Sequence, residues 1–188
     1  MPAPATARLD PAQSILVIVD VQARLAPHVL GAEGLERRCI ALVKGAQVLG
    51  VPVLATEHCA EAIGATLPSI AGLLAPAQVI GKRHFSAMDE AALPRALGES
   101  GRRQVLVAGM EAHVCVMQTA LGILAAGYDT RIVVDAVGSR READSAAAIA
   151  RMLAAGAGQV STEMLLFEWL ANADHPGFRK ILALVKNY

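Results

Sequence analysis

The chain has 188 residues, a length that suits one domain spanning residues 1–188. Its 17 Lys and Arg residues balance its 17 Asp and Glu residues, so the composition provides no basic excess for nucleic acid. Residues 1–11 lack a signal-peptide pattern, and no apolar run approaches the roughly 20 residues of a membrane span. We therefore expect a cytoplasmic protein that binds neither nucleic acid nor membrane.

Three cysteines, Cys39, Cys59 and Cys115, have neither paired nor metal-like spacing, which argues against a disulfide framework and a structural zinc site. We expect no cofactor and no metal. The hydrophobic share of 54% with only 3% aromatic residues suits a sheet covered on both faces. A surplus of Ala, Leu and Val also favours a homo-oligomer, in which part of it is buried against a second subunit.

Short apolar runs alternate with segments of helical spacing along the chain. In order, the predicted strands are 15–19, 51–55, 78–80, 105–108, 132–134 and 159–161, and the predicted helices are 35–49, 89–97, 114–126, 142–155, 163–172 and 176–185. Most of the runs are β-branched and do not alternate with polar residues, as in strands buried on both faces. The pattern predicts an α/β fold of three layers, α/β/α, with a central, mainly parallel six-stranded sheet of the Rossmann-like type.

Ligands of an open parallel sheet bind beyond the carboxyl ends of its strands, so the residues that follow each run are the candidates for a site. Cys115 lies where the helix after the fourth run begins, and we expect the helix N-terminus to stabilise its thiolate, the form of cysteine that attacks. A buried, inert thiol is the alternative for this position.

Two charged residues follow other runs at the same predicted edge. Asp20 ends the first run, where its carboxylate could accept and return a proton, or merely cap a helix or face solvent. Lys82 follows the third run, where its ammonium could hold a thiolate, or merely be solvated. A nucleophile, a base and a cation at one edge form the combination that acyl transfer requires.

Three segments that contain these residues resemble one known family. They are Ile15-Leu16-Val17-Ile18-Val19-Asp20-Val21-Gln22, Lys82-Arg83-His84-Phe85-Ser86, and Gly109-Met110-Glu111-Ala112-His113-Val114-Cys115-Val116 with Gln118-Thr119-Ala120. From about Ser14 to Val160 the chain resembles the isochorismatase-like hydrolases, which include nicotinamidases and N-carbamoylsarcosine amidases. The segment 135–140 is also similar to the family, and we interpret it as structural more than catalytic.

The resemblance implies a cysteine hydrolase that cleaves a carbon–nitrogen bond of amide type in a small molecule through a thioester, so we expect a small-molecule substrate as the partner. It implies Cys115 as nucleophile, Asp20 as general base and Lys82 as its electrostatic partner. It also implies a cis peptide bond between Met110 and Glu111 and an oxyanion hole made by the N–H groups of Glu111 and Cys115. The residues expected to line the substrate pocket are Leu25, His58, Phe85, Ala112 and His113.

The sequence departs from the family at several positions. Ala112 replaces a frequent Thr and His113 a frequent Asp, so the substrate can differ from those of relatives. Nicotinamidases bind a metal after the second strand, whereas this chain has His58 there and no second histidine nearby. A nucleotide-binding protein is disfavoured because no glycine-rich phosphate loop follows Asp20. A vinyl-ether-cleaving member and a non-catalytic member of the same fold stay as alternatives.

Overall fold

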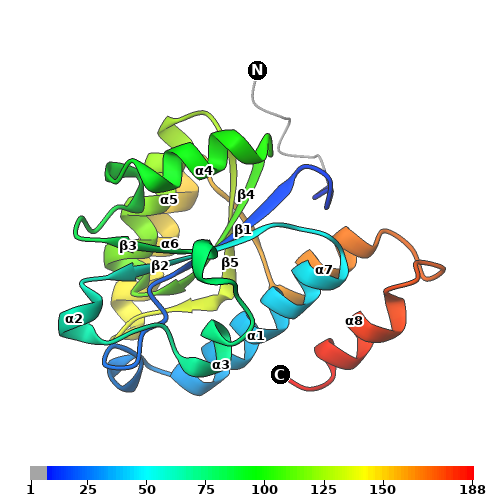
Figure 1. Cartoon of the computed structure of the whole chain (residues 1–188), viewed down its shortest axis with the longest axis horizontal. Helices are drawn as coiled ribbons and strands as arrows, with labels where there is room; N and C mark the ends of the chain where they lie inside the picture. Colours follow the sequence, from blue (N-terminus) through cyan, green and yellow to red (C-terminus); the bar gives the residue numbers. More distant parts are fainter. Residues whose placement is uncertain (1–7) are drawn as a thin grey trace.

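Six parallel strands form the centre of the protein, as seen in a computed structural model that describes residues 8–188 (Figure 1). Their bounds are β1 (Ser14–Val19), β2 (Val53–His58), β3 (Val79–Lys82), β4 (Gln104–Met110), β5 (Asp129–Gly138) and β6 (Gly158–Val160). The strand order is β3-β2-β1-β4-β5-β6, and each neighbouring pair is parallel. The predicted parallel sheet is confirmed, with no antiparallel strand within it.

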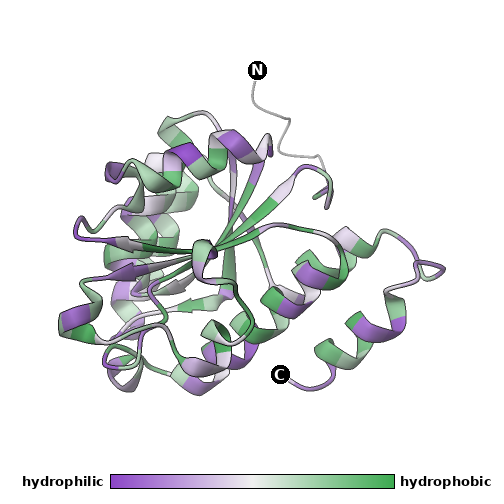
Figure 2. Ribbon diagram, in the orientation of Figure 1, coloured by the Kyte–Doolittle hydropathy of each residue, from purple (hydrophilic) through white to green (hydrophobic). Residues whose placement is uncertain are grey.

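The strands form because their side chains are apolar on both faces. Every residue of β1 and β4 is buried. In β1, Leu16 and Ile18 belong to one core cluster, whereas Ile15 and Val17 belong to the cluster on the other face of the sheet. Figure 2 shows the hydrophobic colour concentrated along these central strands. This two-sided burial explains why the apolar runs are continuous in the sequence.

Helices cover both faces of the sheet, which confirms the three-layer α/β/α prediction. Helices α1, α7 and α8 contribute to one core cluster, and helices α4, α5 and α6 contribute to the other; in Figure 1 α8 lies beside α1. The bounds are α1 (Ala32–Val48), α2 (Ala60–Ile63), α3 (Pro68–Ala71), α4 (Ala92–Ser100), α5 (Met117–Ala125), α6 (Glu142–Ala154), α7 (Thr162–Leu170) and α8 (Phe178–Val185). Helices α2 and α3, four residues each, were not predicted because one turn shows no hydrophobic period.

The strand order has a switch point between the two central strands, β1 and β4. The chain winds outward from β1 to β3, then returns to the other side of β1 with β4 and winds outward again to β6. The strand order therefore reverses between β1 and β4, and at such a switch point the loops after the two strands separate and leave room for a ligand. Asp20 follows β1, and the segment that contains Cys115 follows β4.

Gly109 shows how closely β1 and β4 approach each other at this point. It pairs with Val19, its φ is +122°, and a Cβ atom added to it would lie 2.0 Å from the Val19 carbonyl oxygen. We expect Gly109→Ala to lower the free energy of unfolding by about 4 kcal/mol or more, because backbone cannot yield to the clash. Gly127→Ala is the matched control, since Gly127 also has positive φ (+84°) but a Cβ atom added to it would have no atom within 4 Å. If urea unfolding shows that both variants lose the same free energy of unfolding, the close approach of β4 to β1 at Gly109 is not the cause of the loss.

The part of the chain in residues 8–188 contains no helix that is both long and apolar enough to cross a membrane. The expectation that residues 1–11 carry no targeting segment falls largely on residues 1–7, which lie outside the described residues.

Candidate active site

Asp20 lies immediately beyond β1 and is completely buried. Its backbone has φ 50°, a left-handed conformation that Asp and Asn adopt more readily than most residues. Its N–H donates to the Thr56 carbonyl oxygen at 3.1 Å, and the Thr56 hydroxyl donates to Asp20 Oδ1 at 2.6 Å. The neighbouring strand β2 thus fixes both the backbone and one oxygen of this carboxylate. Asp20 is therefore neither a helix cap nor a solvated carboxylate, the two alternatives considered for it from the sequence.

Lys82 is the last residue of β3 and reaches across the end of β2 to the same carboxylate. Its Nζ lies 2.7 Å from Asp20 Oδ2, and both side chains are at most 1% exposed. The two groups form a buried ion pair. The ammonium also donates to the carbonyl oxygens of His84 (3.2 Å) and Phe85 (3.1 Å). Lys82 is therefore a buried, fully engaged cation and not a solvated surface lysine.

Cys115 lies in a five-residue π-helical turn, η4 (Ala112–Val116), that leads directly into α5. Its side chain is buried, and the charges of Asp20 and Lys82 both act on the pKa of its thiol. Burial first, and then the negative charge of Asp20, raise the pKa of the Cys115 thiol to about 12, against the lowering effect of Lys82. The helix N-terminus was expected to stabilise the Cys115 thiolate, whereas burial and the Asp20 carboxylate act in the opposite direction and favour the thiol.

The other two cysteines differ from Cys115 in their surroundings. Cys39 is completely buried in α1, and burial together with the charge of Asp135 raises the pKa of its thiol to about 12. Cys59 is half-buried after β2, in a left-handed backbone conformation with φ 40°. All three thiols are free. The pKa of Cys115 is affected by a carboxylate and an ammonium, whereas that of Cys39 is affected by two carboxylates, Asp135 and Glu36.

The segment that joins β4 to the nucleophile turn contains an unusual backbone group. The bond between Met110 and Glu111, where the resemblance implies a cis peptide, is cis. Within residues 8–188 the N–H of Glu111 donates to no other group, while its carbonyl oxygen accepts from the N–H groups of Val114 and Val116. The Glu111 carboxylate receives a hydrogen bond from Arg140 Nε at 2.9 Å. A free, fixed N–H donor therefore lies four residues before the thiol.

The expected pocket residues come from different elements around the three central groups. Gln22 hydrogen-bonds the N–H and carbonyl oxygen of His58, whose ring centroid lies 5.2 Å from that of Phe85. Phe85 is 52% exposed, so it is available to a ligand.

The other three expected pocket residues lie on other elements. His113 Nδ1 lies 2.9 Å from the hydroxyl oxygen of Ser139. Of the other two expected residues, Leu25 is half-buried against the core and Ala112 is buried in the same cluster as Cys115.

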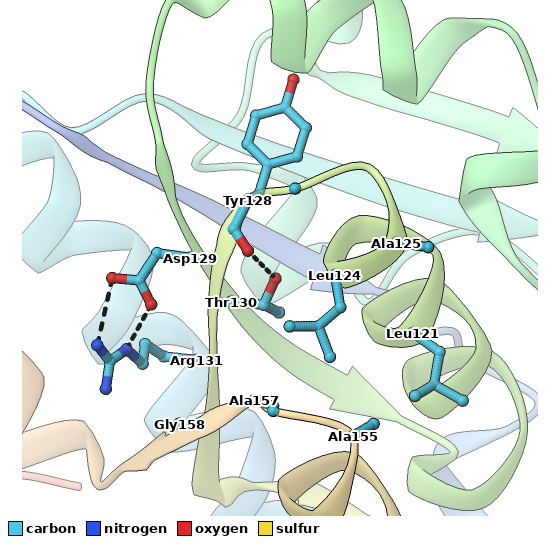
Figure 3. Close-up of a pocket in the computed structure, with 12 residues that line it drawn as sticks. Leu121, Leu124, Ala125, Tyr128, Asp129, Thr130, Arg131, Ala155, Ala157 and Gly158 are labelled. Carbon is cyan, nitrogen blue, oxygen red and sulfur yellow. Dashed lines mark hydrogen bonds and ion pairs between the residues drawn. The ribbon is translucent and has the colours of Figure 1, made fainter. Parts of the chain in front are cut away.

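Two hollows lie at opposite ends of the sheet. One, of about 460 Å³, is lined by Lys82 together with Glu57, Cys59, Ala60, Glu61, Gly81, Arg83, His84 and Glu90. Its lining includes neither Asp20 nor Cys115, and none of the five residues expected to line the substrate pocket. The other, of about 550 Å³, lies where β5 and β6 begin and is shown in Figure 3, with Arg131 hydrogen-bonded to Asp129. Because it opens at the amino end of the sheet, it is remote from Cys115. Among residues 8–188 there is no group of three or more His, Cys, Asp or Glu that could hold a metal ion.

Sequence reasoning did not single out three contributors to the site. Thr56 orients Asp20, Ser139 contacts His113, and Arg140 pairs with Glu111. The signal for Thr56 was its position after an apolar run.

Arg140 and Ser139 fall within the segment 135–140, which we interpreted as structural. That interpretation suits Asp135, whose Oδ1 accepts from the N–H and hydroxyl of Thr162, but two residues of this segment contact the nucleophile turn.

The fold and these three groups define a doubly wound α/β protein with a buried thiol, carboxylate and ammonium at its switch point. The model of the Isochorismatase domain matches residues 14–164, and the chain belongs to this family of hydrolases. It is 33% identical over 180 residues to isochorismatase domain-containing protein 2A of Mus musculus. The aligned region covers 95% of this chain and 85% of the mouse protein.

Two solved structures extend the comparison to three dimensions. The structure of the MAR1 ribonuclease from Caenorhabditis elegans superposes with a TM-score of 0.89 at 30% identity, covering 96% of this chain and 93% of that one. YcaC from Pseudomonas aeruginosa, solved with hexane-2,5-diol and covalent acrylamide, also gives 0.89 at 28% identity, covering 95% and 92%. The family resemblance predicted from three short segments is thereby confirmed over nearly the whole chain.

Proposed function

We propose that the protein hydrolyses a carbon–nitrogen bond of a small amide through a thioester on Cys115. The observation that carries this proposal is the convergence of the Cys115 thiol, the Asp20 carboxylate and the Lys82 ammonium in one buried site. Stability alone does not explain a buried ion pair beside a cysteine, because replacing both charges of such a pair by apolar side chains often costs little stability. A catalytic role explains why the three groups lie together.

In the proposed acylation step, Asp20 accepts the thiol proton as the sulfur attacks the carbonyl carbon. Because burial and Asp20 raise the pKa of the thiol, we expect proton transfer to accompany attack. The carbonyl oxygen becomes an oxyanion, which accepts hydrogen bonds from the N–H groups of Glu111 and Cys115. Lys82 pairs with Asp20 Oδ2 at 2.7 Å and so holds the carboxylate in place.

The proposed leaving-group step explains why an amide suits this site. Once protonated, Asp20 is a buried acid beside the tetrahedral carbon, and an amine leaves only after its nitrogen has gained a proton. The carbon–nitrogen bond breaks, the amine departs with the proton from Asp20, and the acyl group stays on sulfur. Asp20 then takes a proton from water as the water oxygen attacks the thioester carbonyl. The carbon–sulfur bond breaks, Asp20 returns this proton to the sulfur, and the carboxylic acid leaves.

The aromatic residues near the three central groups suit a small substrate with a flat or apolar part. His58 and Phe85 present aromatic surface near Lys82, and His113 presents its ring near the nucleophile turn. Arg83 and Arg140, the arginines nearest the site mouth, each pair with a glutamate, so they form no free basic track for a polynucleotide. Ribonuclease activity is the description of a relative, and RNA is therefore included in the test as a competing substrate.

A panel of small primary amides and N-carbamoyl compounds tests the proposal, with ammonia release as the readout. We expect Cys115→Ser to reduce release on any active compound to the uncatalysed level, and hydroxylamine to divert the product to a hydroxamate by trapping the thioester. Vinyl-ether cleavage, or cleavage of an RNA oligomer, that survives Cys115→Ser would overturn the assignment. Light scattering of the same preparation tests the expected homo-oligomer.

A further inference from the structure

We infer that Arg140 is a positioning residue that acts through Glu111 to hold the oxyanion-binding N–H in place, and this inference rests on the proposed function. Arg140 lies beyond the end of β5, twenty-five residues after Cys115 in the chain. Its guanidinium Nε donates to Glu111 Oε1 at 2.9 Å. Glu111 is the residue whose own N–H is free among residues 8–188.

Three consecutive residues of one segment contact the end of β4, Glu111 and the turn η4. Gly138 pairs with Met110 in the β4–β5 ladder, Ser139 Oγ lies 2.9 Å from His113 Nδ1, and Arg140 binds Glu111. The ladder itself reaches this far because β5 carries extra residues between its two zones of pairing with β4: Val107 pairs with Ile132, but Gly109 pairs with Val137. This shift is what brings residues 138–140 beside the turn.

The contacts fix the peptide unit that carries the proposed oxyanion donor from both ends. On its amino side, Met110 is held by its ladder partner Gly138. On its carboxyl side, the side chain of Glu111 is held by Arg140 and its carbonyl oxygen by the N–H groups of Val114 and Val116. With both ends held, the direction of the Glu111 N–H is set before substrate arrives, which is the condition for strong oxyanion stabilisation.

Charge gives Arg140 a second effect at the same place. The Glu111 side chain is only 10% exposed, so its carboxylate is a largely desolvated negative charge close to where the proposed oxyanion forms. Arg140 neutralises this charge, and without it the carboxylate would oppose the developing oxyanion. The guanidinium is 58% exposed and reaches the carboxylate from the solvent side, so its removal leaves the core packing intact.

Two reactions of the same thiol separate positioning from general damage. Acylation by p-nitrophenyl acetate forms a sulfur–carbon bond, passes through an oxyanion, breaks the ester carbon–oxygen bond and releases nitrophenolate, with the thiol proton taken by Asp20. Alkylation by iodoacetamide forms a sulfur–carbon bond and expels iodide without any oxyanion. An oxyanion-positioning residue should therefore affect the first reaction and spare the second.

We expect Arg140→Met to slow the nitrophenolate burst roughly 10- to 100-fold, somewhat less than loss of an oxyanion donor itself, while iodoacetamide labelling of Cys115 changes by less than about twofold. Arg140→Lys should restore part of the acylation rate. Glu111→Gln in the Arg140→Met background should cause no further loss, because Arg140 acts through that carboxylate. Arg141→Met is the matched control, since its side chain is 83% exposed and pairs only with Asp144.

The outcomes separate this inference from the proposed function. A wild-type protein that gives no acyl adduct on Cys115 refutes the proposed function itself. A normal wild-type burst that Arg140→Met leaves unchanged overturns the positioning role alone. Equal slowing of acylation and alkylation also overturns it, because that result would mean general distortion of the turn.

Discussion

Lys82→Met lowers the free energy of unfolding by roughly 3 to 5 kcal/mol, the usual cost of breaking a buried ion pair by removing one partner. The reason is the burial of Asp20, which would keep its hydrogen bond from Thr56 but lose the ammonium that lies 2.7 Å away. Met has nearly the length of Lys and fits the same channel without the charge. Urea unfolding at pH 7 measures the difference.

The double variant Lys82→Met with Asp20→Asn serves as the control for this prediction. It removes both charges, and we expect it to recover most of the lost stability, because an uncharged pair leaves no carboxylate without a partner. Asn also tolerates the left-handed backbone at position 20. If the single variant unfolds within about 1 kcal/mol of the wild type, the two side chains are not the buried pair described here.

Asp20→Asn alone separates thiol ionisation from catalysis. The carboxylate raises the pKa of Cys115, so its removal should bring that pKa below about 12, with Lys82 left to favour the thiolate. We expect iodoacetamide to label the variant faster than the wild type between pH 9 and pH 11. Hydrolysis of any amide substrate should nevertheless fall roughly 10²- to 10⁴-fold, because the variant has no group to accept the thiol proton or return it to the amine.

The opposite signs of these two effects make the prediction specific. Absorbance at 240 nm follows thiolate formation against pH, with Cys115→Ser as the blank for the other two cysteines. Slower labelling and slower hydrolysis together would mean that Asp20 supports the fold of the site and not its proton transfer. Full hydrolysis with an altered pKa would remove Asp20 from the proposed mechanism.

The positions of the central residues could be predicted because they follow from local pattern and sheet topology. Apolar runs marked β1, β3 and β4, and a parallel sheet brings the ends of such runs to one edge. Asp20, Lys82 and the turn with Cys115 all lie at the ends of these runs, so their proximity required no knowledge of the loops. The register and the strand order were not needed for that conclusion.

The features that were missed depend on contacts between distant segments. The thiolate prediction considered the helix that begins near Cys115, but the pKa of the thiol is set by burial and by Asp20, 95 positions earlier in the chain. The pairing of Arg140 with Glu111 depends on the shifted register between β4 and β5, which no local pattern reveals. The π-helical turn around Cys115 likewise gave no sequence signal distinct from an ordinary helix start.

The most direct test of the central claim is peptide mapping by mass spectrometry of the protein quenched with acid during turnover of an amide substrate. The proposed mechanism predicts one acyl group per active chain, located on Cys115, sensitive to hydroxylamine and absent in Cys115→Ser. Turnover with no adduct on Cys115, or with the acyl group on Cys39 or Cys59, would contradict it.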